Sequence, residues 1–545
     1  MIFRGIQARQ EAALVVFSVA LAAVLCRSAL RAGQLLGVPS GESWGRALVT
    51  RQIARWWQGT PVGQADLLGW PEQTLLWPID PALQLIQVPA ELLLGPGQGL
   101  ALAAVVVLSV SGWATGHLAL RLGASLPAAL SAALLVEGAP YLLRNLQDAV
   151  LEAAAIGFAA LAAAQIAAAV ATPTGWRLLW VGLSVLLLSL VSPYYTVYLA
   201  LGCGLCVPLV RRRSWLWVAA ASALACGLAL LPLLLTEGGA HGRFSLPSGG
   251  YQLNPGPLVT VDGQLLSRPR LNPVGASSGW AELLYRTPGG AAVLLAAVLS
   301  LLLPGGRRWA ALGAVFFVGG PGIPMLLRAL EVPGVRIDSP LQWLLKVLPA
   351  TASLGNPTRL LAPWILLSAV GFALAASRLR RGRLLIVGVS ALALVELSAQ
   401  LPGLVLPSTA YRAPASVLSA LEGATVVFPS GDFPLFHPDV APKEALFLAG
   451  VAGVAVPADY GRFRIPADLA EQWALSGVSG APLSAPCLEM PAPPAAGFAS
   501  LLLLEDRLSG PGRAALRDWL VARGARERAA GEGMSAWDIT GVSLR

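Results

Sequence analysis

Long apolar stretches separated by short polar loops dominate the sequence. A membrane-spanning helix needs roughly 17–25 predominantly apolar residues. The chain offers eleven such segments, at residues 12–30, 97–119, 125–143, 149–171, 178–191, 194–210, 214–235, 289–304, 308–329, 358–377 and 385–402. A further run, 80–95, is interrupted by Pro89 and carries polar residues, which is typical of an interfacial or re-entrant helix. We therefore predict a mainly helical, polytopic membrane bundle with about eleven spans over residues 1–402.

The pattern changes in the last part of the chain, residues 403–545. The stretches GATVVFPSG, FASLLLLED and MSAWDIT indicate strands, and PGRAALRDWLVARGA indicates an amphipathic helix with Pro511 near its start. A segment of this length is within the usual range for a domain. We expect a small α/β domain here, outside the membrane.

Charge supports a membrane protein and gives it an orientation. Only 12% of the 545 residues are charged and 56% are hydrophobic, whereas soluble proteins carry roughly 25% charged residues. The net charge of +9 is uneven, at +12 before Pro402 and −3 from there on. Because basic residues gather in alternate short loops, the positive-inside rule predicts a cytoplasmic N-terminus and an extracytoplasmic C-terminal domain. The basic excess is therefore not evidence of nucleic-acid binding.

Three segments between spans are long and should lie on the outer side, at residues 31–79, 236–288 and 330–357. The first contains ESWGRALVTRQIARWWQG, whose tryptophans and aliphatic residues fall near one helical face. We predict an amphipathic helix lying at the membrane interface, where tryptophan is favoured.

Several function classes lack support in the sequence. Cys203 and Cys206 form a CxxC inside a predicted span, without a second pair or a nearby histidine, so helix packing explains them better than metal or redox chemistry. The sequence has no phosphate-binding glycine loop and no arrangement of Ser, His and Asp suited to nucleophilic catalysis. This argues against an ATP-driven transporter.

In order along the chain, several motifs resemble those of the bacterial polytopic type C glycosyltransferases and their relatives. GESWGRALVTRQIARWWQG and ADLLGWPEQTLLWPID are similar to the family's first outer loop, and GAPYLLRNLQDAVLEAAAIG to a later polar turn. LVSPYYTVYLAL is similar to a span ending in aromatic residues, and LPATASLGNPTRLLAPW to an arginine-containing loop. In the family the first-loop acid is usually Asp, whereas this chain has Glu42.

The resemblance implies an inverting glycosyltransferase of the bacterial inner (plasma) membrane. Its expected partners are membrane lipids, a polyprenyl-phosphate sugar as donor, and a glycan, lipid or protein as acceptor. A carboxylate must accept the proton of the acceptor hydroxyl, or hold a metal that activates it. Cationic groups must stabilise the departing lipid phosphate.

Glu42 is the candidate catalytic base, because it lies just outside the first predicted span. It could equally cap the helix that follows, since an acid at a helix N-terminus contributes about 0.3–1 kcal/mol. Arg46 in the same stretch is a candidate for binding the substrate. Asp66, and Asp80 at the end of the loop, could supply a second acid or bind a metal. Oxygen ligands would suit Mg²⁺ or Mn²⁺, but no spacing specifies a metal and no cofactor is assigned.

Further candidates for binding the substrate lie at the outer ends of later spans. Asp148 and Glu152 are four residues apart, which would place them on one helix face. The residues around Asp148 and Glu152 could instead form an ordinary polar turn. Tyr194 and Tyr195 could instead anchor the chain at the membrane interface. Arg359 is our candidate phosphate ligand, and its alternative role is snorkelling to the lipid headgroups. The candidates are Arg144, Asn145, Asp148, Glu152, Tyr194, Tyr195 and Arg359.

Two other functions stay open. A transporter or flippase for a lipid-linked saccharide should show internal repeats or broken helices paired at the membrane midplane, and we find no convincing repeat in the sequence. A non-catalytic assembly protein could retain the same fold.

Overall fold

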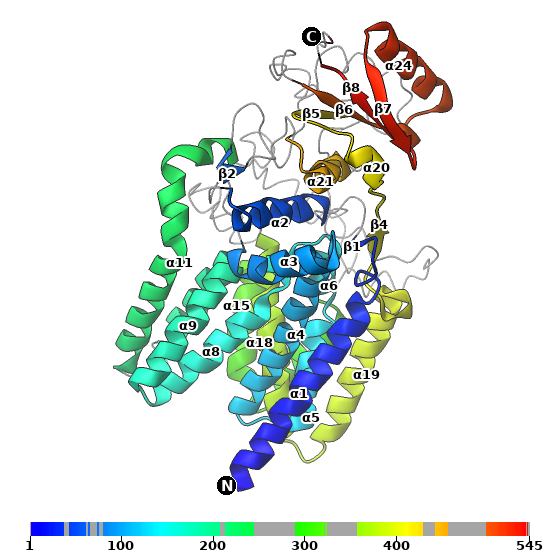
Figure 1. Ribbon diagram of the computed structural model, residues 1–545. Coiled ribbons are helices and arrows are strands. Elements are labelled where there is room, and N and C mark those ends of the chain that lie inside the picture. Colours follow the sequence, from blue (N-terminus) through cyan, green and yellow to red (C-terminus); the bar gives the residue numbers. More distant parts are fainter. Residues whose placement is uncertain are drawn as a thin grey trace.

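The computed structural model describes residues 2–37, 43–60, 64–65, 74–75, 80–207, 213–244, 289–320, 322–323, 357–428, 442–455, 498–540 and 542. Glu42 and Asp66 lie outside these ranges. The chain forms a helical bundle with a small mixed sheet near the C-terminus, and the N-terminus lies at the opposite end of the molecule (Figure 1).

Each of the eleven predicted apolar segments coincides with a helix or with two consecutive helices. The helices are α1 (Ile2–Cys26), α4 (Gln98–Arg121), α5 (Leu126–Glu137), α6 (Pro140–Gln147), α7 (Leu151–Ala154), α8 (Ile156–Ala171), α9 (Gly175–Val191), α10 (Pro193–Cys206), α11 (Ser214–Phe244), α14 (Ala291–Leu302), α15 (Arg307–Gly319), α18 (Leu361–Ser377) and α19 (Gly382–Gln400). The largest buried apolar cluster joins α1, α4, α5, α8 and α18. Small residues allow close approach, since a Cβ on Gly157 of α8 would overlap the backbone of Ser111 on α4.

Several helices are broken or short. Among the described residues, three helices are long and apolar enough to cross a membrane by themselves, α1 from Gln7, α4 and α19. The pair α5 and α6 adds a fourth if its bend of 43° belongs to one span. Other apolar helices have 10–17 residues. The chain is thus a multi-pass membrane protein whose predicted spans are partly divided.

Two helices, α2 (Ser43–Trp57) and α3 (Pro81–Leu94), lie across the end of the bundle nearest the C-terminal sheet (Figure 1). Both were predicted as helices, and α3 includes Pro89 in its interior. The protein partner of α2 was not predicted from the sequence. α2 packs between α3 and α21 (Pro442–Ala452), so that Trp44 is only 2% exposed and contacts protein on both sides.

The C-terminal sheet has the strand order β5-β6-β8-β7. Strands β5 (Thr425–Phe428), β6 (Ser500–Leu504) and β8 (Met534–Asp538) were predicted, as was helix α24 (Gly510–Ala522). β5 pairs with β6 in parallel, and β8 is antiparallel to both of its neighbours. The sequence pattern missed β7 (Arg526–Gly531), whose exposed residues are mostly charged or small. Glu532 and Gly533 connect β7 to β8 with positive φ at both positions, as tight hairpins require.

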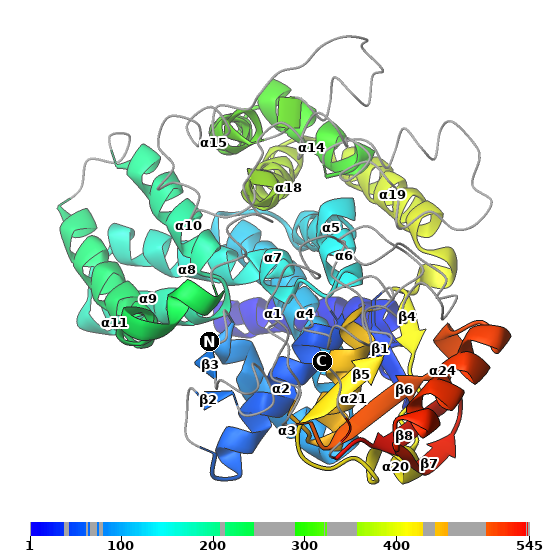
Figure 2. The same cartoon turned by 90° about the horizontal axis from the view of Figure 1, so that it is seen from above.

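The C-terminal region is tied to the loop between α1 and α3. Strand β1 (Gln34–Leu36) pairs antiparallel with β4 (Ser408–Ala410). Above the bundle, α21 and the sheet lie on the side of α2 and α3, away from α14 and α15 (Figure 2). A two-stranded ladder, β2 (Gln64–Ala65) with β3 (Thr74–Leu75), lies in the same loop, and short helix α20 (Ala415–Leu418) precedes β5.

Candidate functional site

A buried cluster of charged side chains lies where α2, α3, α7 and the start of α18 meet. At its centre is Arg46, on the first turn of α2. One of its terminal nitrogens, Nη1, donates to Asp80 Oδ2 at 2.9 Å, and the other, Nη2, donates to Glu152 Oε2. The Arg46 side chain is 9% exposed, and its two partners are less exposed still. One guanidinium therefore holds two carboxylates from different parts of the chain.

Glu152 connects this arginine to a second one. Its other oxygen, Oε1, accepts from Arg359 Nη2 at 3.3 Å. The Arg359 side chain is 15% exposed, more than that of Arg46. Among the described residues, two guanidiniums and two carboxylates thus form one buried network.

Arg359 is also held by an aromatic ring. Its guanidinium carbon lies 3.8 Å from the centre of the Tyr194 ring, on the first turn of α10. Stacking of this kind keeps the planar guanidinium in one orientation while its edge stays able to donate. Arg359 itself comes from the short 3₁₀-helix η3 (Pro357–Leu360), directly before α18. The residues directly before α18 and the start of α10 therefore converge on one cation.

Asp80 lies at the N-cap of α3, where α3 meets α2. Burial raises the pKa of this carboxyl from 3.8 to about 6, against the opposing effect of Arg46, and the charge on Glu152 raises it further. Gln84 Nε2 donates to the second oxygen of Asp80 at 3.3 Å. Burial therefore makes Asp80 a weaker acid than usual despite its ion pair with Arg46.

A strained turn places Glu152. Helix α6 ends at Gln147, and Ala149 then adopts a φ of +60°, a conformation that residues with a Cβ rarely adopt. The amide of Val150 donates to the carbonyl of Asn145 at 2.7 Å, which closes the helix C-terminus in the way a glycine usually does. The prediction that Asp148 and Glu152 share one helix face is wrong, because this turn separates α6 from α7.

Neighbouring polar contacts hold α2 in place. The hydroxyl of Thr50, one turn after Arg46, lies 3.1 Å from Gln84 Oε1 and 3.0 Å from Gln87 Oε1 on α3. Arg51 Nε donates to Glu91 Oε1 at 3.2 Å, and the other oxygen of Glu91 accepts from the amide of Gly97 at 2.8 Å. Contacts from α2 through α3 to the start of α4 therefore fix the backbone that carries Arg46.

Four of the predicted binding residues come together: Arg46, Glu152, Tyr194 and Arg359. Tyr195 points elsewhere, because its buried hydroxyl donates to the carbonyl of Ala153. Asn145 donates to the carbonyl of Tyr141 in its own helix at 2.7 Å. Arg144 and Asp148 are partly buried on α6 and at its C-cap.

Reasoning from the sequence missed Arg51 and the role of Glu91. The signal was present, since Arg51 falls on the predicted amphipathic helix and Glu91 on the predicted interfacial or re-entrant helix 80–95. No group of three or more His, Cys, Asp or Glu side chains that could hold a metal ion occurs within the part of the chain that the structure describes. The assignment of Mg²⁺ or Mn²⁺ stays without support from geometry.

The chain has a fold similar to that of type C membrane glycosyltransferases. Among solved structures, the chain is similar to the arabinofuranosyltransferase AftD from Mycobacteria, with a TM-score of 0.57 and 13% identity. The match covers 97% of this chain and 40% of that chain, so this chain spans about two fifths of that protein's length.

The chain also matches the apo oligosaccharyltransferase of Archaeoglobus fulgidus with a TM-score of 0.42 and 11% identity, over 90% of this chain and 69% of the other. No protein-family model matches the chain. No curated protein matches it either.

Proposed function

We propose that the chain is a membrane glycosyltransferase that moves a sugar from a polyprenyl-phosphate donor to an acceptor at the outer face of the membrane. The observation that carries this proposal is the buried network of Arg46, Glu152 and Arg359 at the end of the bundle opposite the N-terminus. Guanidiniums fixed in this way suit a phosphate, because they offer paired donors in a planar fork. The fold shared with AftD supports the same class of reaction.

In this proposal the donor phosphate binds to Arg359. The Tyr194 ring and Glu152 leave part of the guanidinium edge to the phosphate oxygens, and Arg359 is the more exposed of the two arginines. The acceptor oxygen then attacks the anomeric carbon, the bond from that carbon to the phosphate oxygen breaks, and the lipid phosphate leaves with the bonding electrons. Positive charge already in place lowers the cost of this departure.

The acceptor proton needs a carboxylate. Glu42 is our proposed base, one residue before α2 and four residues before Arg46. Asp80 is the second carboxyl that could exchange a proton at this site, given its raised pKa. In the orientation we propose, the N-terminus is cytoplasmic and both carboxyls are on the outer side, where the positive-inside rule places them.

The test uses the full chain, purified into lipid nanodiscs. Polyprenyl-phosphate-linked arabinofuranose is the first donor to try, and other polyprenyl-phosphate sugars follow. Release of polyprenyl phosphate and transfer to the acceptor are both measured. We expect Glu42→Gln to lower kcat, and Arg359→Gln to raise the KM for the donor.

Matched variants on exposed parts of α24, Asp518→Asn and Arg513→Gln, should leave both constants unchanged. Full activity of Glu42→Gln would overturn the assignment of the base. Movement of donor lipid between leaflets without sugar transfer would instead support a flippase. Failure of every donor to bind or react would favour a non-catalytic assembly protein.

A further inference from the structure

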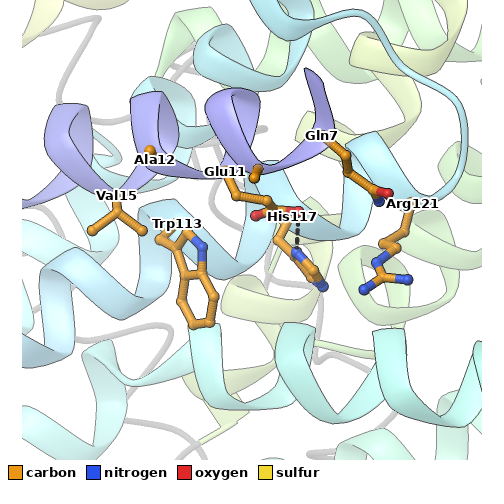
Figure 3. Close-up of a pocket in the computed structure, with 8 residues that line it drawn as sticks. Gln7, Glu11, Ala12, Val15, Trp113, His117 and Arg121 are labelled. Atoms are coloured by element: carbon orange, nitrogen blue, oxygen red, sulfur yellow. Dashed lines mark hydrogen bonds and ion pairs between the residues drawn. The ribbon is translucent and has the colours of Figure 1, made fainter. Parts of the chain in front are cut away.

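A groove lies between α1 and α4 at the N-terminal end of the bundle, far from the charged cluster. Its volume is about 440 Å³, and it is an open groove on the surface of the bundle rather than an enclosed cavity. Gln7, Glu11 and Val15 line it from α1, and Trp113, His117 and Arg121 line it from α4 (Figure 3). Nothing in the proposed glycosyl transfer uses these residues.

Helical periodicity explains how the groove is built. Gln7, Glu11 and Val15 are four residues apart on α1, and Trp113, His117 and Arg121 are four residues apart on α4, so each set forms a stripe on one helix face. His117 Nδ1 and Glu11 Oε1 are 2.7 Å apart and join the two stripes. The side chain of His117 is 9% exposed and that of Glu11 is 25% exposed, so the acid still reaches the groove.

The surroundings of the groove are apolar on the side that faces away from the bundle. Val15 and Val19 of α1 are 41% and 46% exposed, and Val16 is 68% exposed. In a multi-pass bundle such a surface meets lipid. The groove therefore lies beside a surface that suits lipid, and its end carries the exposed Arg121 and Gln7.

Each group in the groove matches one part of a phospholipid. Arg121 can donate to a phosphate, and Glu11 can accept from a primary ammonium group. Trp113, whose ring centre is 5.7 Å from that of His117, suits the boundary between headgroup and acyl chain. Charged residues inside a membrane bundle are costly and usually serve a binding function.

We propose that this groove binds one phosphatidylethanolamine molecule of the leaflet at the N-terminal end. The paired signs of charge select this headgroup. An anionic phospholipid without an amine would bring its charge close to Glu11. A choline headgroup has the positive charge but no N–H to donate to the carboxylate.

The test is native mass spectrometry of the full chain in detergent, with phosphatidylethanolamine, phosphatidylglycerol and phosphatidylcholine of identical acyl chains. We expect phosphatidylethanolamine to bind with the highest affinity. Arg121→Gln should weaken phosphatidylethanolamine binding about fivefold. Glu11→Gln should abolish the preference for ethanolamine over choline while binding of phosphatidylglycerol does not fall.

The control variant is Arg383→Gln, which removes an exposed arginine in the first turn of α19 and should change none of these affinities. Equal binding of the three lipids, or a preference for phosphatidylglycerol, would overturn the proposal. A photoreactive phosphatidylethanolamine gives a readout in the unmodified chain, where we expect labelled peptides from residues 7–15 and 113–121. Labelling spread evenly over the lipid-facing helices would contradict it. Neither experiment depends on glycosyl transfer.

Discussion

Glu152 balances the charge of two buried arginines. We therefore expect its removal to lower the stability of the fold more than removal of any other residue of the cluster. Changing Glu152 to Gln keeps its shape but removes the carboxylate that Arg46 and Arg359 share. Breaking a buried ion pair in this way costs about 3–5 kcal/mol. We expect a large fall in the melting temperature of the purified protein, measured by intrinsic fluorescence.

A surface pair provides the comparison. Glu422 is 72% exposed and contacts Arg528 at 2.8 Å. Pairs of this kind contribute about 0–1 kcal/mol, so Glu422→Gln should leave the melting temperature nearly unchanged. Equal shifts for the two variants would show that the buried network does not stabilise the fold.

A second buried acid allows a test of packing inside the bundle. Glu137 of α5 is fully buried in the bundle, beside Ser18 of α1. A Cβ on Gly112 of α4 would overlap the Glu137 carboxylate. Gly112→Ala should therefore destabilise the protein by about 1–3 kcal/mol through overpacking.

The double variant makes this prediction specific. The variant Glu137→Ala lacks the carboxylate. In this background Gly112→Ala should destabilise the protein much less than it does in the natural chain. The four proteins form a double-mutant cycle, read by chemical unfolding in micelles. If the two substitutions simply add, the contact between Gly112 and Glu137 is not the source of the cost.

Most residues of the charged cluster could be predicted from the sequence, but the ion pairs between them could not. Arg46 and Glu152 are 106 residues apart in the chain, and Glu152 and Arg359 are 207 apart. Their meeting depends on how α2, α7 and η3 pack. The sequence also suggested a continuous helix from Asp148 to Glu152, because no glycine marks the turn that Ala149 makes with positive φ.

At the level of elements, helix α2 couples the C-terminal region to the site. Trp44 contacts Phe447 of α21 with ring centres 5.3 Å apart, and Tyr411 contacts the same ring at 4.9 Å. A Cβ on Gly450 would meet Leu48 of α2, so the two helices approach closely. The side chain of Arg46 extends from the same helix to Glu152.

We therefore predict that Phe447→Ala loosens α2 although Phe447 touches no charged residue of the cluster. Truncating a buried aromatic side chain costs about 3–5 kcal/mol. Hydrogen exchange followed by mass spectrometry should show faster exchange in peptides from α2 and α21, and little change in α8 or α18. The matched variant Trp519→Ala, on partly exposed α24, should affect only the C-terminal sheet. Unchanged exchange in α2 of Phe447→Ala would contradict the coupling.

The contact between Trp44 and Phe447 was not predicted from the sequence. The tryptophans and arginines of α2 have the composition of a helix at a membrane surface, and the pattern cannot distinguish lipid from protein as the partner of an apolar face. The eleven apolar segments were easier to predict, because length and composition alone define them. Strand β7 was missed because its residues are mostly exposed, and only its pairing with β8 defines it as a strand.

For the molecule as a whole, the buried acid at the top of the bundle predicts how stability depends on pH. The pKa of Asp80 rises from 3.8 to about 6 in the folded protein. The folded state therefore binds this proton more tightly than the unfolded chain does. This contribution favours folding at low pH and is lost as the pH rises through 6, with a change of about 1.4 kcal/mol for each unit of pKa difference.

Arg46, Glu152 and Gln84 face Asp80, and the raised pKa of Asp80 already includes their effects. Because other groups titrate over the same range, the informative quantity is the difference in melting temperature between the natural chain and Asp80→Asn. We expect the natural chain to lose stability relative to Asp80→Asn between pH 4 and pH 6, and the difference to be constant above pH 7. The exposed Asp518→Asn serves as the control and should give a flat difference. A natural chain that gains stability over Asp80→Asn as the pH rises would mean that the attraction of Arg46 outweighs burial, and Asp80 would then stay ionised at neutral pH.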